Sequence, residues 1–103
     1  MNLIQHFVDG KIFKGTSKRT GKVFNPATGE QSSEVSFATK DDINKSVSIA
    51  KKAFLTWSQK TPLNRSRILF KFKELIEKNS DELTKIIVSE HGKVYEDAKG
   101  SLT

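Results

Sequence analysis

The sequence contains no cysteine. This absence excludes disulfides, thiolate metal sites and a cysteine nucleophile. The chain also has no apolar stretch near the roughly 20 residues that a membrane span needs, and its opening residues lack the charged start and apolar run of a secretion signal. We therefore expect a cytoplasmic protein without a membrane partner.

The chain has 103 residues, of which 35% are hydrophobic. This length suits one small domain and is too short for a two-domain enzyme with its own cofactor cleft. A chain of this size buries roughly 60 to 65% of its unfolded surface. We expect marginal stability for the chain alone and a need for a partner.

The charge balance is basic, with 18 Lys and Arg against 12 Asp and Glu, a formal net charge of +6. Basic residues occur in every segment and are mixed with acidic ones in the predicted helices. A surface that binds phosphates needs its basic residues gathered on one face. The distribution indicates a solvated surface, and we expect no nucleic-acid partner.

Residues 1–38 are predicted to form strands and turns. Asp9-Gly10 lies between two apolar pairs and is a strong hairpin signal, because both positions accept positive φ. Residues 14–22 are polar with two glycines, which predicts a loop. A second extended segment starts at Val23-Phe24 and ends at the turn 25–29. Alternation at residues 35–37 predicts a half-buried strand.

Residues 39–103 are predicted to be helical, because the apolar period changes to about 3.6. Thr39 is expected to cap a helix to about Trp57, with acidic residues in its first turn. Its predicted buried stripe comprises Ile43, Val47, Ala50, Ala53, Phe54 and Trp57. Core packing of the aromatic residues is preferred to a platform for stacking bases.

Three further helical segments follow. Pro62 begins the second helix, which is expected to end near Asn79. Ser80 is predicted to cap a third helix that ends at Gly92, a left-handed C-cap. The predicted inward residues of these helices are Ile68, Leu69, Phe72, Leu75 and Ile76, then Leu83, Ile86 and Ile87. Residues 94–103 begin a fourth pattern that stops without a cap, which indicates that the polypeptide once continued.

No segment carries a complete catalytic or ligand-binding motif. Residues 10–17 have the glycine spacing of a phosphate loop, but Thr16 stands where the lysine is required, so a plain hairpin is preferred. His6 and His91 lack carboxylates at metal-ligand spacing. Ser89, Glu90 and His91 are consecutive, so they cannot form a hydrolase triad.

The ordered motifs resemble the opening of the aldehyde dehydrogenase superfamily. They are Val23-Phe-Asn-Pro-Ala-Thr-Gly-Glu30, Ala50-Lys-Lys-Ala-Phe54, Trp57, Pro62, Arg65, Arg67-Ile-Leu69, Glu74-Leu-Ile76 and Glu82-Leu83. His6-Phe-Val-Asp-Gly-Lys11, Glu90-His-Gly-Lys93 and Asp97-Ala-Lys-Gly-Ser101 are most similar to the CoA-acylating methylmalonate-semialdehyde dehydrogenase group, although Val94 stands where that group often has threonine. The similarity covers nearly the whole chain.

The resemblance implies an α/β fold, with this chain as the N-terminal segment of an NAD-binding domain in a longer enzyme. In that enzyme a cysteine thiolate attacks the aldehyde, hydride passes to NAD, and CoA takes the acyl group. The parent reaction converts semialdehyde, CoA and NAD to propionyl-CoA, CO2 and NADH. No catalytic, cofactor-binding or metal-binding residue of the family can be assigned to a position in residues 1–103.

The expected protein is therefore an inactive N-terminal fragment that binds neither NAD nor CoA. Its expected partners are the remainder of the enzyme or homologous subunits. Three alternatives stay open, of which the least favoured is a small basic nucleic-acid binder. The parent could be another aldehyde or semialdehyde dehydrogenase, or the chain could be a non-catalytic module that binds a full-length homologue through its leftover apolar stripes.

Overall fold

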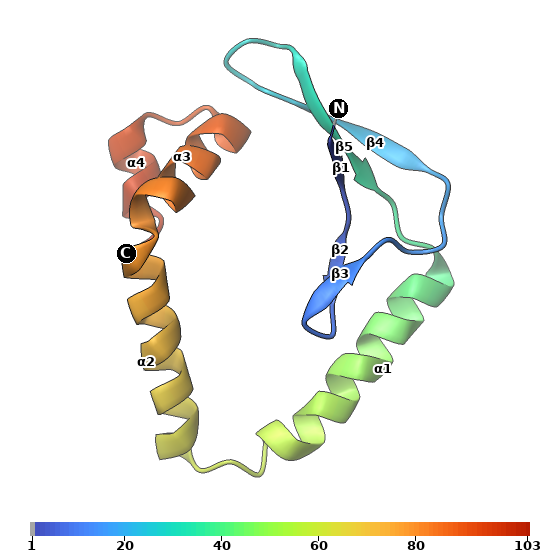
Figure 1. Ribbon diagram of the computed structural model, residues 1–103, viewed down its shortest axis with the longest axis vertical. Helices are drawn as coiled ribbons and strands as arrows, with labels where there is room; N and C mark the ends of the chain where they lie inside the picture. The colour runs from blue at the N-terminus through green and yellow to red at the C-terminus, as the bar shows by residue number, and fades with distance from the viewer. Residues whose placement is uncertain (1) are drawn as a thin grey trace. The chain divides into compact units, whose positions relative to one another are not determined.

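The computed structural model describes residues Asn2–Thr103. Within this range five short strands are followed by four helices, which confirms the predicted α/β class of strands and a hairpin followed by helices (Figure 1). The strands are β1 (Asn2–Ile4), β2 (His6–Val8), β3 (Lys11–Phe13), β4 (Thr20–Phe24) and β5 (Gln31–Ser36). The helices are α1 (Lys40–Trp57), α2 (Pro62–Lys78), α3 (Ser80–His91) and α4 (Tyr95–Gly100).

The chain divides into two compact units. The first consists of the residues up to Val23 together with Gln31–Lys60, so it contains most of the strands and α1. The second joins the turn Phe24–Glu30 to Thr61–Thr103, which carry α2, α3 and α4.

The first unit contains a three-stranded sheet and a separate hairpin. The sheet has the order β1-β5-β4, and β1 runs parallel to β5 with Asn2 opposite Ser33 and Ile4 opposite Val35. β2 and β3 pair antiparallel around Asp9 and Gly10, whose φ angles are 57° and 73°. Positive φ at both positions is what a two-residue hairpin turn requires, so the predicted Asp-Gly hairpin is confirmed.

The predicted loop over residues 14–22 is wrong in its last part, because β4 begins at Thr20. Its burial alternates, with Gly21 and Val23 partly covered. A Cβ on Gly21 would stand 2.6 Å from the Phe37 ring. Gly21 therefore leaves room for an aromatic ring beside a strand and is not a loop signal.

The predicted helix limits agree with the structure at most ends. α1 follows Thr39, α2 starts at Pro62, and Gly92 ends α3 with a φ of 81°. The N-cap of α3 is Asn79 and not Ser80, and its side chain makes no cap bond. The Asn79 amide instead donates to the Leu75 carbonyl 2.8 Å away, because the same residue also ends α2.

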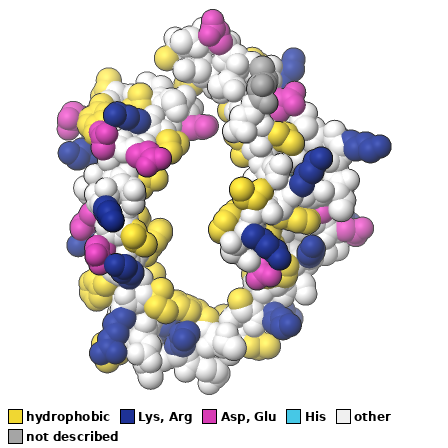
Figure 2. Space-filling view, in the orientation of Figure 1, with side chains coloured by type: hydrophobic (Ala, Val, Ile, Leu, Met, Phe, Trp, Pro, Cys, Tyr) yellow, Lys and Arg dark blue, Asp and Glu magenta, His cyan; other side chains and the backbone are white. Residues whose placement is uncertain are grey.

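The predicted burial of the helix stripes is wrong for α1 and for most of α2, whereas Ile76, Leu83 and Ile87 are partly covered. Ala98 is the only buried hydrophobic residue within Asn2–Thr103. Side chains of α1 such as Val47 and Phe54 are 60% and 61% exposed, and Phe72 of α2 is 60% exposed. Figure 2 shows hydrophobic side chains at the surface over α1 and α2. The helical period of the apolar residues identifies the apolar face of each helix, but no element of the same unit buries that face.

The second unit is held by contacts between α3 and α4. The Tyr95 hydroxyl donates to Asp81 at 2.7 Å, beside the fully buried Thr84 and Ala98. The turn that joins β4 to β5 approaches the end of α3, since a Cβ on Gly92 would lie 3.1 Å from Cγ of Pro26. Gly92 thus supplies both the left-handed cap and the space for this proline.

Candidate functional site

The most connected polar site lies where the loop after β3 meets the start of α1. Asp42 is only 3% exposed. Its carboxylate accepts hydrogen bonds from the backbone N–H groups of Thr39 at 2.9 Å and Thr16 at 3.1 Å. The Thr39 hydroxyl accepts the Asp42 N–H in return, which completes a capping box. The Thr16 hydroxyl donates to the same carboxylate at 3.1 Å. We call Thr16, Thr39 and Asp42 the junction cluster.

The junction cluster keeps Asp42 ionised. The backbone N–H groups of Thr39 and then of Thr16 lower the pKa of this carboxyl to about 2. The dipole of α1 also lowers the pKa of Asp42, since the positive end of the helix faces the carboxylate. A carboxylate with so low a pKa is a weak base at neutral pH, so the cluster is suited to tying a loop to a helix and not to proton transfer.

His6 lies beside the junction cluster. A Cβ on Gly15 would stand 2.9 Å from Oδ2 of Asp42 and 3.2 Å from Nε2 of His6, so the two groups approach the same point. Nε2 of His6 is buried without a hydrogen-bond partner. The His6 ring is tilted against Phe13, with 6.1 Å between the ring centroids. Gly15 has a φ of 80° and leaves the space in which these side chains meet.

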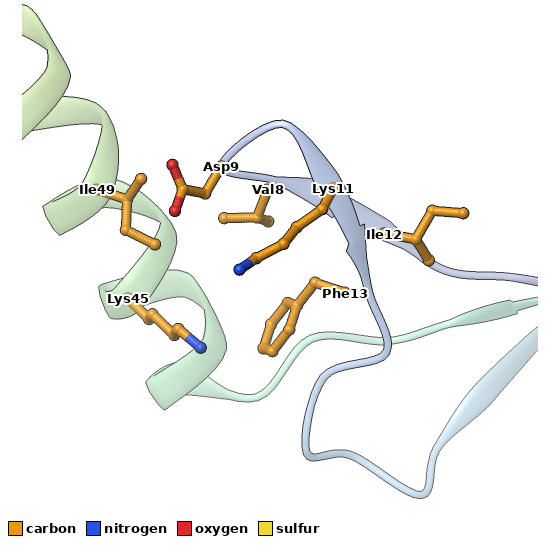
Figure 3. A pocket seen from close by; sticks show the side chains of 7 residues that line it. All are labelled: Val8, Asp9, Lys11, Ile12, Phe13, Lys45 and Ile49. Atoms are coloured by element: carbon orange, nitrogen blue, oxygen red, sulfur yellow. The ribbon is translucent and has the colours of Figure 1, made fainter.

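A small pocket of about 100 Å³ lies between the hairpin and α1 (Figure 3). Lys45 of α1 places its ammonium 4.4 Å from the centroid of the Phe13 ring, a cation–π contact. Lys11 extends into the same space from β3, whereas Ile12 points away from α1. Asp9 lines the pocket as well, and the arrangement packs the hairpin on the helix.

The glycine-spaced segment 10–17 forms the hairpin and the junction loop, as the plain-hairpin interpretation predicted. The N-terminus of α1 is occupied by the Asp42 carboxylate, and α3 begins with Asp81 and Glu82. Anionic side chains at these positions oppose a phosphate group. These two helix starts therefore do not favour a phosphate group, and we assign no step of a redox reaction to the described residues.

The C-terminal polar residues also serve local structure. The Ser89 hydroxyl donates to the Ile86 carbonyl at 2.8 Å, an ordinary contact within the helix. Among residues Asn2–Thr103, no group of three His, Asp or Glu side chains is placed to hold a metal ion. None of the helices in that range is long and apolar enough to cross a membrane.

One member of the junction cluster could not be predicted from the sequence. Thr39 and the acidic first turn of α1 were predicted, but the contribution of Thr16 was not. Thr16 lies 26 residues before Asp42, and no local pattern relates the two. The nearest sequence signal is Gly15-Thr16 itself, which indicates a turn without naming its partner.

Comparison with known families shows to which family the chain belongs. The aldehyde dehydrogenase family profile matches residues 12–103, and this chain belongs to that family. Malonate-semialdehyde dehydrogenase 2 of Bacillus cereus is 38% identical over 100 residues, which are 97% of this chain and 20% of that protein. Malonate-semialdehyde dehydrogenase of Halalkalibacterium halodurans is 39% identical over 100 residues, which are 96% of this chain and 20% of that protein.

Solved structures show the same relationship. A methylmalonate-semialdehyde dehydrogenase from Oceanimonas doudoroffii superposes with a TM-score of 0.93 at 40% identity, over 99% of this chain and 21% of that one. A candidate methylmalonate-semialdehyde dehydrogenase from Sinorhizobium meliloti, complexed with NAD, superposes with a TM-score of 0.93 at 42% identity. The match covers 97% of this chain and 20% of that one. The chain thus spans about a fifth of the length of these relatives and aligns with their N-terminal part.

Proposed function

We propose that this chain is the N-terminal scaffold segment of an NAD-dependent, CoA-acylating methylmalonate-semialdehyde dehydrogenase and that it has no activity alone. The whole enzyme would convert methylmalonate semialdehyde, CoA and NAD to propionyl-CoA, CO2 and NADH. Within it, residues 1–103 would form part of the NAD-binding domain and would supply strands and helices that support the reactive centre.

The proposal rests on the sequence identity of this chain to solved enzymes that are named for different aldehydes. The two structures named for methylmalonate semialdehyde are 42% and 40% identical to this chain. Those named for other aldehydes are less similar, such as succinate-semialdehyde dehydrogenase of Burkholderia pseudomallei at 32% and betaine aldehyde dehydrogenase of Staphylococcus aureus at 25%. The absence of cysteine supports the inactivity of the chain alone, because the implied nucleophile is a thiolate.

A graft experiment tests the proposal. This chain would replace the matching N-terminal stretch of the Bacillus cereus malonate-semialdehyde dehydrogenase and, separately, of the Burkholderia succinate-semialdehyde dehydrogenase. NADH formation would be followed with each host's semialdehyde, with and without CoA. The matching stretch of the Halalkalibacterium enzyme, grafted into both hosts, is the matched control.

The proposal predicts no NADH from the isolated chain and a clearly larger retained fraction of activity in the malonate-semialdehyde host. NADH formation by the chain alone would contradict its inactivity. Equal or better function in the succinate-semialdehyde host, with the control graft favouring the other host, would contradict the assignment to the malonate- and methylmalonate-semialdehyde dehydrogenases.

A further inference from the structure

One face of α1 is covered within its own unit and the adjacent face is not. The covered side consists of Asp42, Ser46 and Ile49, which are spaced by four and three residues and are the shielded positions in the body of the helix. Ile49 lines the hairpin pocket, and Asp42 and Ser46 line a second hollow beside the same hairpin. Ile43 and Val47 lie at the edge of that second hollow but stay more than half exposed. The larger apolar side chains lie on the next face round the helix.

That second face, which we call the α1 stripe, consists of Ile43, Val47, Ala50 and Phe54. Ile43, Val47 and Phe54 are between 54% and 61% exposed. Residues spaced by three and four along a helix form one continuous surface, so these side chains make a single apolar strip. A strip of this size on an otherwise charged chain marks a contact surface.

α2 has the same property in the second unit. It has no buried residue, and its exposed apolar side chains lie on more than one face. Ile68, Phe72 and Leu75 form one face, Leu63 and Phe70 lie on the opposite side, and Leu69 lies between the two. A helix that is apolar on both sides belongs in an interior.

We infer that the isolated chain binds, without a covalent link, to a homologous semialdehyde dehydrogenase that lacks its own N-terminal fifth, and that the α1 stripe is a principal contact. This inference rests on the family relationship used in the proposed function. The matched relatives contain this segment within chains of which it is only 20 to 21%. The remaining four-fifths of such a chain is the body against which a segment with the same fold packs.

Co-expression tests this inference by binding and not by activity. A tagged copy of this chain would be produced together with the Bacillus cereus enzyme from which the matching stretch has been removed. The readout is the amount of that truncated enzyme recovered in soluble form with the tag. The wild-type chain is expected to recover it, and the tag alone is expected to recover none.

Single substitutions identify the face. Val47→Asp and Phe54→Asp place a carboxylate on the α1 stripe and are expected to lower recovery by roughly tenfold or more. Leu55→Asp is the matched control, because Leu55 is 66% exposed, lies on the same helix and faces about 120° away from the stripe. Recovery with Leu55→Asp is expected to stay within about twofold of wild type. Circular dichroism of each free variant would show that the helix content is unchanged.

Several results would overturn the inference. One is a failure of the wild-type chain to recover the truncated enzyme while the covalent graft in the same host is soluble. Equal recovery by Phe54→Asp and Leu55→Asp would remove the α1 stripe as the contact. A stable dimer of the isolated chain that Val47→Asp dissociates would show that a second copy covers the stripe instead. Because recovery does not depend on turnover, recovery of the truncated enzyme together with equal or better graft activity in the succinate-semialdehyde host would defeat the proposed function alone.

Discussion

Gly15→Ala perturbs the point where the loop after β3 is tied to α1. A φ of 80° is unfavourable for alanine and costs about 1–2 kcal/mol. The new methyl group would also lie 2.9 Å from the Asp42 carboxylate and 3.2 Å from the His6 ring, so one of them must move. Overpacking of this kind costs about 1–3 kcal/mol. We therefore expect Gly15→Ala to lower the free energy of unfolding by about 2–5 kcal/mol in total.

Gly10→Ala is the matched control. Gly10 lies in the same unit with a φ of 73°, and its added methyl group would meet nothing within 4 Å. Gly10→Ala should lower the free energy of unfolding only by the backbone term, about 1–2 kcal/mol. Urea titrations of both variants, followed by far-UV circular dichroism at one fixed concentration of a stabilising osmolyte, measure the difference. Equal costs for the two substitutions would refute the steric role assigned to Gly15.

Three further predictions concern single contacts. Because the pKa of Asp42 falls to about 2 on folding, its contribution to stability is complete above about pH 4 and is lost as the pH falls toward 2. Asp42→Asn should therefore flatten the acid limb of a stability titration, and an unchanged limb would contradict this. The hydrogen bond to Asp81 raises the pKa of Tyr95, so the stabilisation by this bond is present below about pH 10 and is lost as the pH rises further. Tyr95→Phe should abolish this alkaline loss of stability in the urea assay, and persistence of the loss would argue against the bond. Lys45→Met keeps the aliphatic stem but removes the ammonium over Phe13, and it should cost about 0.5–1 kcal/mol in the same urea assay, against no change for the remote Lys51→Met.

Local signals in the sequence were sufficient where a single residue determines the backbone. Asp9-Gly10 specified the hairpin, Thr39 and Pro62 specified helix starts, and Gly92 specified a helix end. Each works through φ, a missing N–H group or a side-chain oxygen, and none requires a distant partner. These features could be predicted without the structure.

Features that depend on distant partners could not be predicted. β4 has a polar composition, and its pairing with β5 explains why Gly21 is in a strand. The link from Thr16 to Asp42 likewise joins segments without a shared pattern. Helical periodicity correctly located the apolar faces, but it does not report whether the covering surface belongs to the same chain. The exposure of Phe54 and Phe72 therefore required the structure.

Hydrogen exchange of α1 and α2 tests the central claim, which is that their apolar faces belong against the rest of a dehydrogenase. Exchange would be measured for the isolated chain and for the graft in the malonate-semialdehyde host. We predict that amides of both helices exchange at least roughly a hundredfold more slowly in the graft, because packing supplies most helix stability. Equally strong protection of both helices in the isolated chain would contradict the account.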